Sequence, residues 1–435
     1  MIYHLFELLK DYDIPGQGLM HYLSFRAIAA SITAMLLSLV AGSKIIKWLQ
    51  KKQIGESIRE LGLEGQMEKK GTPTMGGIII LISILIPVLL FANLTNIYII
   101  LLIISTLWLG LLGFADDYIK VFKKNKEGVN EKTKLIVQIV LGLGIALTVC
   151  FSDQIVIRES PTSHPEVNIA EGIEVKENET IEGGIAESIE KNINPDSVKS
   201  TKTTIPFVKH HEFDYKSLIP FEGKWADILK WIIYAAMIVI VITACSNGSN
   251  LTDGLDGLNT GISAIIGVTL GIFAYLSGNI INSDYLNIMY IPGSGEITIF
   301  MAAMVGALIG FLWYNSFPAQ VFMGDTGSLA IGGIIGVSAI LIRKELLIPI
   351  LCGVFFVESL SVLMQRFYYK RTRKSSGTGK RILKMAPLHH HFQKEGIESI
   401  IKFPKRAIPE SKIVLRFWIV GIILATITVA LLKLR

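Results

Sequence analysis

Long apolar runs are the feature that most constrains the fold of this 435-residue chain. A helix of roughly 17 to 25 apolar residues can cross a hydrocarbon core of about 30 Å, and about ten such runs occur here. They lie at Phe25–Ile46, Met75–Ala92, Ile97–Ala115, Leu135–Phe151, Ile228–Cys245, Ile262–Leu276, Ile297–Trp313, Leu329–Ile342, Leu346–Phe367 and Ile413–Leu432. The content of 51% hydrophobic and 18% charged residues excludes an ordinary soluble domain and a disordered chain. The sequence therefore predicts an all-α polytopic membrane protein.

Basic residues are unevenly distributed between the connecting segments. Lys and Arg are frequent after the first, third and ninth runs, whereas residues 277–296, after the sixth run, contain none. By the positive-inside rule, the segments that follow odd-numbered runs are cytoplasmic, and both termini lie outside. Residues 1–20 lack the pattern of a cleaved signal peptide, so we expect the first helix to stay in the membrane.

One long polar insertion, residues 152–226, divides the chain into transmembrane parts at residues 1–151 and 227–435. Loops of this length are translocated largely regardless of charge, so we expect the insertion outside the cytoplasm. Its Glu- and Asn-rich composition fits either a small β-containing cap or a flexible acidic segment. Cys150, Cys245 and Cys352 lie in or beside apolar runs and are predicted to be core residues rather than metal ligands.

Polar clusters follow runs one, three, five, seven and nine, which places all of them on the same membrane face. Polar groups at membrane depth are costly and survive where they line a site. We therefore expect one composite site on the cytoplasmic face. The clusters are Lys69–Gly77, Asp116-Asp117 with the following lysines, Asn247–Asn259, Asn315–Gly327 and Ala386–Phe392.

Asp116 and Asp117 follow an apolar run that we expect to end as a helix at Ala115. Acids at a helix C-terminus oppose the macrodipole, which favours a functional role over a solvated helix end. Asp253 and Asp256 are three residues apart and would share a face if a helix starts there, as a functional pair or as a simple cap.

Asp325, in Gly-Asp-Thr-Gly, fits an Asx turn as well as a functional site. A calcium loop of the EF-hand type starting at Asp253 is excluded, because its twelfth position is Ala264 rather than Glu.

Several carboxylates, glycine-rich backbone and lysines on one face match the needs of phosphate chemistry. Mg²⁺ prefers oxygen ligands, usually carboxylates together with substrate phosphates, so we expect it as cofactor. Three adjacent histidines, His389–His391, cannot all easily face one ion, which favours substrate contact over a zinc site. The basic run 370–384 fits anionic lipid headgroups as well as a catalytic role.

These clusters resemble, in order and spacing, the signatures of the phospho-N-acetylmuramoyl-pentapeptide transferases, a branch of the polyprenyl-phosphate sugar-1-phosphate transferases. The resemblance extends from Phe25-Arg-Ala27 to Arg416-Phe-Trp418, and the consecutive histidines resemble this branch in particular. Two departures are the insertion around residues 154–200 and the stretch Gln393–Pro409, which is longer than usual.

The resemblance implies an enzyme of peptidoglycan synthesis in the bacterial cytoplasmic membrane. It would join UDP-N-acetylmuramoyl-pentapeptide to undecaprenyl phosphate, with release of UMP and formation of lipid I, and act as a homodimer without nucleic acid. Two alternatives stay open. One is the same chemistry on UDP-N-acetylglucosamine. The other is a polytopic transporter, which the one-sided motifs and the lack of a visible repeat disfavour.

The resemblance also assigns roles to residues of this chain. It implies Asp325 as the leading magnesium ligand, with Asp117 and Asp253 as further ligands, and Asp116 and His389 as further catalytic residues. Asp116 would position the lipid phosphate rather than act as its base, because such a phosphate is already mostly dianionic at neutral pH. The implied substrate contacts are Lys69, Thr74, Lys120, Lys132, Asn250, Asp256, Asn315, Phe322, His390 and His391.

Overall fold

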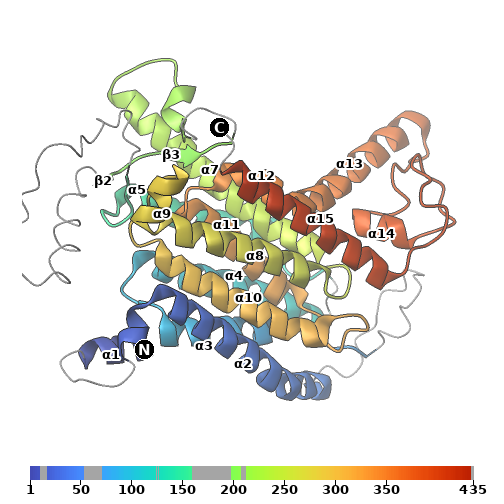
Figure 1. The fold of residues 1–435 in the computed structure, drawn as a ribbon. Helices are drawn as coiled ribbons and strands as arrows, with labels where there is room; N and C mark the ends of the chain where they lie inside the picture. Colours follow the sequence, from blue (N-terminus) through green and yellow to red (C-terminus); the bar gives the residue numbers. More distant parts are fainter. Residues whose placement is uncertain are drawn as a thin grey trace, which may run out of the picture.

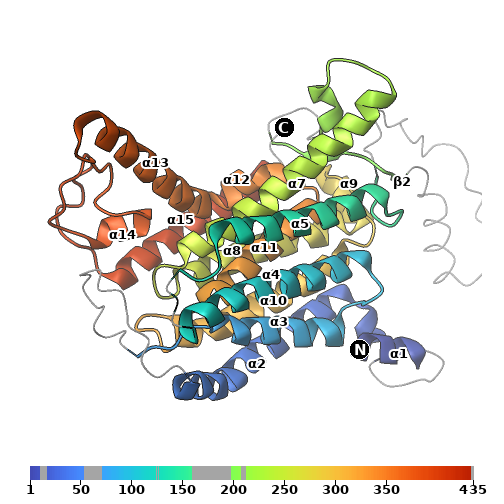
Figure 2. The same cartoon turned by 180° about the vertical axis from the view of Figure 1, so that it is seen from behind.

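The protein is seen here in a computed structural model that describes residues 1–9, 17–52, 71–123, 125, 127–158, 197–206 and 212–432. These residues form a helical bundle with four short strands (Figures 1 and 2). The long helices are α2 (Leu23–Lys52), α3 (Gly77–Phe91), α4 (Ile97–Val121), α5 (Glu131–Phe151), α7 (Lys224–Thr252), α8 (Leu258–Ser277), α10 (Gly295–Asn315), α11 (Gly324–Leu341), α13 (Gly353–Ser376) and α15 (Glu410–Leu431). The short ones are α1 (Ile2–Leu8), α9 (Ile280–Leu286), α12 (Ile348–Leu351) and α14 (Leu388–Gln393), with 3₁₀ turns η1 (Gln17–His21), η2 (Tyr215–Leu218) and η3 (Glu345–Leu347).

The prediction of a polytopic helical membrane protein is confirmed, although the count of spans differs from the predicted ten. In the described residues, eight helices are long and apolar enough to cross a membrane. The last predicted run but one is broken, because η3 and α12 are bent by 74° relative to α13, and counting this pair as one span gives nine. The run at Met75–Ala92 forms α3, whose 15 residues are about 22 Å long and so shorter than a typical hydrocarbon core.

Helix α11 is the centre of the bundle, with 89% of its apolar window buried. It packs mainly on α4 and α7. Gly332 lies against the Cys245 carbonyl of α7, and Gly333 lies against Leu109 of α4, so that a Cβ at either glycine would collide with the neighbouring helix. Small residues of this kind allow close helix packing in membranes, and this packing places the start of α11 beside the end of α4.

The insertion contributes two antiparallel strand pairs to the described structure. Strand β1 (Ile157–Arg158) pairs with β2 (Ser197–Val198), and β3 (Lys202–Thr204) pairs with β4 (Glu212–Asp214). Strand β3 is fixed to the turn after α11, because Thr204 N donates to the Arg343 carbonyl at 3.1 Å and Lys344 Nζ donates to Thr204 Oγ1 at 2.6 Å. The described part of the insertion therefore contains strands, whereas residues 159–196 and 207–211 lie outside the described residues.

The strands, α1 and α9 lie at one end of the bundle, and α14 lies at the other (Figures 1 and 2). We call these the strand end and the motif end. Helix α15 contacts α14 at the motif end and α12 toward the strand end. Which end faces the cytoplasm remains a prediction from the charge distribution.

Candidate active site

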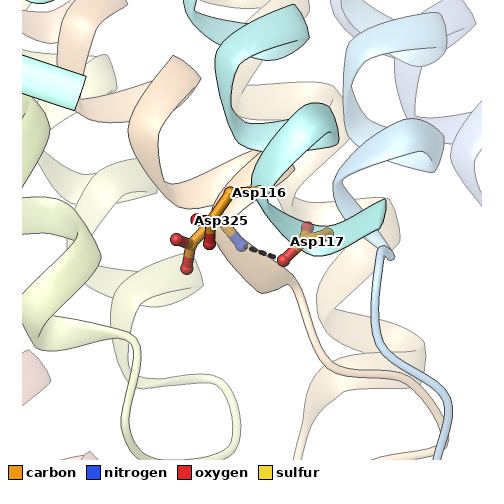
Figure 3. A group of neighbouring side chains, drawn as sticks. All are labelled: Asp116, Asp117 and Asp325. Atoms are coloured by element: carbon orange, nitrogen blue, oxygen red, sulfur yellow. Dashed lines mark hydrogen bonds between the residues drawn. The ribbon is translucent and has the colours of Figure 1, made fainter. Parts of the chain in front are cut away.

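Three carboxylates from two helices meet at the motif end. Asp116 and Asp117 lie on α4, and Asp325 lies in the first turn of α11 (Figure 3). One oxygen from each carboxylate lies within 4.8 Å of the other two. The helices come this close because Gly113 of α4 lies directly against the Asp325 carbonyl, where any Cβ would collide. Oxygen ligands at this spacing are the donor set that Mg²⁺ prefers.

The predicted helix end at Ala115 is wrong, since α4 continues to Val121. Asp116 and Asp117 are therefore inside the helix, and the macrodipole argument for them does not hold. The apolar run marked the boundary of the hydrophobic region, whereas the helix itself extends beyond it. The pair is tolerated there because each carboxylate has partners outside α4.

Asp117 caps α11. Its Oδ1 accepts a hydrogen bond from Asp325 N at 3.1 Å, and its Oδ2 accepts from Thr326 N at 2.9 Å and Thr326 Oγ1 at 2.6 Å. The first N–H groups of a helix lack intrahelical partners and carry partial positive charge, so a carboxylate stabilises them. Gly324, at φ +73°, leaves room for this contact, because a Cβ there would meet Asp117 Oδ2 and Thr74 Oγ1. Asp117 thereby fixes the position of Asp325, and Thr74 lies beside it.

Two lysines join Asp116 to Asp325. Lys120 Nζ is 2.5 Å from Asp116 Oδ2 and 3.2 Å from Asp325 Oδ2. Lys134 Nζ is 2.9 Å from Asp116 Oδ1 and 2.7 Å from Asp325 Oδ2. Asp116 is fully buried and also accepts from Val129 N at 2.7 Å. Asp325 Oδ1 accepts from Asn250 Nδ2 at 2.9 Å, so α4, α5, α7 and α11 all contribute to the cluster.

Lys134 is a site residue that the sequence analysis missed in favour of Lys132. Lys132 is exposed at the start of α5, whereas Lys134 contacts two of the predicted aspartates. The sequence contained a pattern that could have identified Lys134, because Lys134 and Gln138 are four residues apart and so share one face of an otherwise apolar helix. Gln138 is buried against Ser246 and Asn247 of α7, at 3.1 and 3.2 Å. A polar stripe of this kind identifies the face that packs toward a site.

The stretch Asn247–Asn259 is only partly a loop. Helix α7 extends to Thr252 and α8 begins at Leu258, so the expectation that Asp253 and Asp256 share a helix face is wrong. Asp253 instead follows the C-terminus of α7. Burial raises the pKa of Asp253 well above its ordinary value, and the negative charges of Asp325, Asp117 and Asp256 raise it further. A cation bound near these acids would favour the ionised form.

Asp256 and Asn315 hold the loops of the motif end together. Asp256 Oδ2 accepts from Ala319 N at 3.0 Å. Asn315 Oδ1 accepts from Gly257 N and Thr260 Oγ1 at 3.1 and 2.7 Å, and its Nδ2 donates to the Val321 carbonyl at 3.0 Å. Both side chains are buried. Their predicted contact with a nucleotide stays a prediction.

Phe322 is half-buried beside the first cluster. Its N–H donates to the Pro73 carbonyl at 2.9 Å, and its carbonyl accepts from Gly76 N at 2.8 Å. These bonds connect the first and fourth clusters, although about 250 residues separate them in sequence. Lys69 lies outside the described residues.

The three histidines of α14 have different partners. Buried His389 has Nδ1 at 3.2 Å from Glu358 Oε2, and half-buried His390 has Nδ1 at 2.9 Å from Gln393 Oε1. His391 Nδ1 accepts from Lys384 N at 3.0 Å and Nε2 lies 2.7 Å from the Phe403 carbonyl, which requires the proton on Nε2. Burial lowers the pKa of His391, consistent with a neutral ring that fixes the loop.

Comparisons with known proteins identify relatives of this chain. The model of glycosyl transferase family 4 matches residues 202–343, and the first signature of phospho-N-acetylmuramoyl-pentapeptide-transferase matches residues 69–81. Proteins named phospho-N-acetylmuramoyl-pentapeptide-transferase match over the full length of both chains. They include those of Porphyromonas gingivalis at 56% identity, Parabacteroides distasonis at 54% and Flavobacterium psychrophilum at 52%.

Proposed function

The chain belongs to the phospho-N-acetylmuramoyl-pentapeptide transferases, and from that membership we propose its reaction. It transfers phospho-N-acetylmuramoyl-pentapeptide from a UDP donor to undecaprenyl phosphate, releasing UMP and forming lipid I, the first membrane-bound precursor of peptidoglycan. The observation that carries this assignment is the 56% identity over the whole of both chains. The carboxylate and lysine cluster at the motif end supplies the chemistry that the reaction needs.

We place the reacting phosphates at Asp116, Asp325, Lys120 and Lys134. The acceptor phosphate is mostly dianionic at neutral pH, so it needs positioning and charge neutralisation more than a base. Its oxygen bonds to the β-phosphorus of the donor while the bond from that phosphorus to the bridging oxygen breaks, and UMP leaves with that oxygen. The two lysines, which now neutralise Asp116 and Asp325, are within reach to neutralise the phosphate oxygens instead.

The donor set also fits Mg²⁺, which we propose as the cofactor. Asp325 would be its main ligand, with Asp116 and Asp253 nearby, and it would neutralise the diphosphate charge. Asp117 is engaged by three hydrogen bonds from the start of α11, so we assign it chiefly to orienting Asp325. Asn250, which donates to Asp325, fixes the carboxylate from the side of α7.

The assignment is tested with purified full-length protein, undecaprenyl phosphate and magnesium, with UMP release as the readout. UDP-N-acetylmuramoyl-pentapeptide should be turned over, and UDP-N-acetylglucosamine should not. Turnover of UDP-N-acetylglucosamine alone would reject the proposed substrate. The same assay without magnesium, and with magnesium restored, tests the cofactor.

We further propose that the protein lies in the bacterial cytoplasmic membrane as a homodimer with the motif end facing the cytoplasm. The basic segments after α4 and α13 support this orientation. Single cysteines introduced at exposed Lys132 and exposed Asp284, at opposite ends of the bundle, would report the orientation through labelling by an impermeant reagent in intact cells. Labelling of the Lys132 site from outside would contradict it.

A further inference from the structure

Glu358 is a buried carboxylate in the membrane-spanning part of the chain, and the reaction described above does not use it. It lies on α13 with no exposed surface. In the described part of the chain its only ion-pair partner is His389. Burial of an acid in a membrane protein is costly, and such a residue is by default a candidate for function. Its contacts therefore indicate what it is for.

Both oxygens of Glu358 are directed at one residue. Oε1 accepts from the backbone N–H of His389 at 3.2 Å, and Oε2 lies 3.2 Å from Nδ1 of the same imidazole. The first contact fixes the start of α14, and the second fixes the ring. A carboxylate at this distance favours a proton on Nδ1, because a lone pair on Nδ1 would repel the carboxylate oxygen, so the neutral ring carries its lone pair on Nε2.

The other edge of the ring reaches the loop of Asp253. A Cβ at Gly254 would collide with His389 Nε2 and Cε1, so the imidazole lies directly on this glycine. Among the described residues, neither ring nitrogen makes a hydrogen bond, although the ring is fully buried; Nδ1 still has the Glu358 carboxylate 3.2 Å away as an ion-pair partner. A buried acceptor without a partner is unfavourable unless a ligand satisfies it. Gly254 itself is exposed, which leaves this edge of the ring next to the accessible part of the site.

We propose that Glu358 is a positioning residue that holds His389 in the tautomer with Nδ1–H, so that Nε2 accepts a hydrogen bond from the nucleotide-sugar substrate. The substrate group is a hydroxyl or amide N–H, because an unprotonated Nε2 only accepts. This inference rests on the proposed function for the identity of the substrate. The tautomer itself is a property of the protein alone.

The tautomer is measured by ¹⁵N NMR of the full-length protein labelled at histidine, with His389→Asn used to assign the signal. In the wild type, His389 should have the proton on Nδ1. In Glu358→Gln the carboxamide can present its NH₂ group to Nδ1, and the proton should move to Nε2. A proton on Nε2 in the wild type, or the same tautomer in both proteins, would overturn the proposal. Activity plays no part in this measurement, so its failure is distinct from failure of the proposed function.

Kinetics test whether Glu358 acts through His389. Glu358→Gln should lower kcat/KM by about 10- to 100-fold, the range found for carboxylates that orient metal-binding histidines. In the His389→Asn background the same change should cost less than about twofold, because residues that act as a unit are not additive. Glu345→Gln, another buried acid at the strand end, is the matched control and should leave kcat/KM within about twofold. An equal loss of kcat/KM in the wild type and in His389→Asn would mean that Glu358 does not act through His389, which would overturn the proposal.

Discussion

Both ends of the bundle hold ion pairs away from solvent. The cation is an arginine at the strand end, whereas the cations at the motif end are lysines. At the strand end, Arg26 forms a two-pronged pair with Glu296 at 2.7 and 3.1 Å, and Glu296 also accepts from Asn93 N at 2.9 Å. The Arg26 guanidinium lies 4.5 Å from the centre of the Tyr3 ring. At the motif end, flexible lysines are shared between two carboxylates, with Lys120 one-third exposed.

We interpret the arginine pair as structural and the lysine pairs as able to exchange partners. A planar guanidinium fixes a carboxylate in one geometry, whereas an ammonium group is a point charge on a flexible stem that can change partners. The strand-end pair joins α2 and α10 and has no reason to open. In the proposed reaction, the motif-end lysines leave the aspartates when the phosphates bind. Substitutions at the two ends should therefore affect different properties, activity at one and stability at the other.

The largest effect is expected at Asp325. Asp325→Asn keeps the size of the side chain but removes the charge that two lysines and the proposed metal ion share. We predict a loss of kcat on the order of 10² to 10³, the range for removing one preorganised electrostatic group. UMP release at saturating magnesium is the measurement. Asp284→Asn, an exposed acid at the strand end, is the matched control. Wild-type turnover by Asp325→Asn would show that the cluster is not the active site.

The two neighbouring lysines of α5 provide the next comparison. Lys134→Gln removes a charged donor to both Asp116 and Asp325, and hydrogen bonds of charged groups contribute about 1.5 to 3 kcal/mol. We predict a loss in kcat/KM of about 10- to 100-fold. Lys132→Gln changes an exposed side chain and should cost less than about threefold. A larger loss for Lys132→Gln than for Lys134→Gln would support Lys132 as the site residue, as the sequence predicted.

These lysines also illustrate which features the sequence could predict. The apolar runs located all ten long helical segments, and the order of the polar clusters identified the family and most of the residues around Asp325. Helix ends were not predictable from hydropathy, because α4 and α7 extend past their apolar runs to Val121 and Thr252. Partners across the bundle were not predictable either. Glu358 and His389, or Lys134 and Asp325, are brought together only by the packing of separate helices.

The strand-end pair should affect stability with little effect on catalysis. Arg26→Met leaves Glu296, whose side chain is 12% exposed, without its partner, and breaking a buried pair in this way costs up to about 3 to 5 kcal/mol. Thermal unfolding in detergent should show a lower midpoint, while turnover per folded molecule stays within about twofold. Replacing both partners, as Arg26→Met with Glu296→Leu, should recover part of the loss. A large fall in turnover without destabilisation would mean that the two ends are coupled.

A pH dependence of stability is expected from Lys344, which lies in the turn between α11 and η3 and is fully buried. Burial lowers the pKa of Lys344 to about 8, although the negative charges of Glu345 and Glu212 oppose this shift. The unfolded chain therefore holds this proton up to its ordinary pKa of 10.5, whereas the folded protein releases it near pH 8. Because the unfolded state binds more protons in this window, stability should rise with pH between about 8 and 10.5.

Replacement by a residue that does not titrate isolates this contribution. Lys344→Met should abolish the rise that Lys344 causes, which amounts to on the order of 3 kcal/mol across the window. Thermal midpoints of the wild type and the variant at pH 7, 8, 9 and 10 provide the comparison, and their difference removes the titration of other groups. At pH 7 and below the difference should level off, because Lys344 is then largely protonated in both states. A difference that stays constant up to pH 10 would mean that Lys344 keeps its ordinary pKa in the fold.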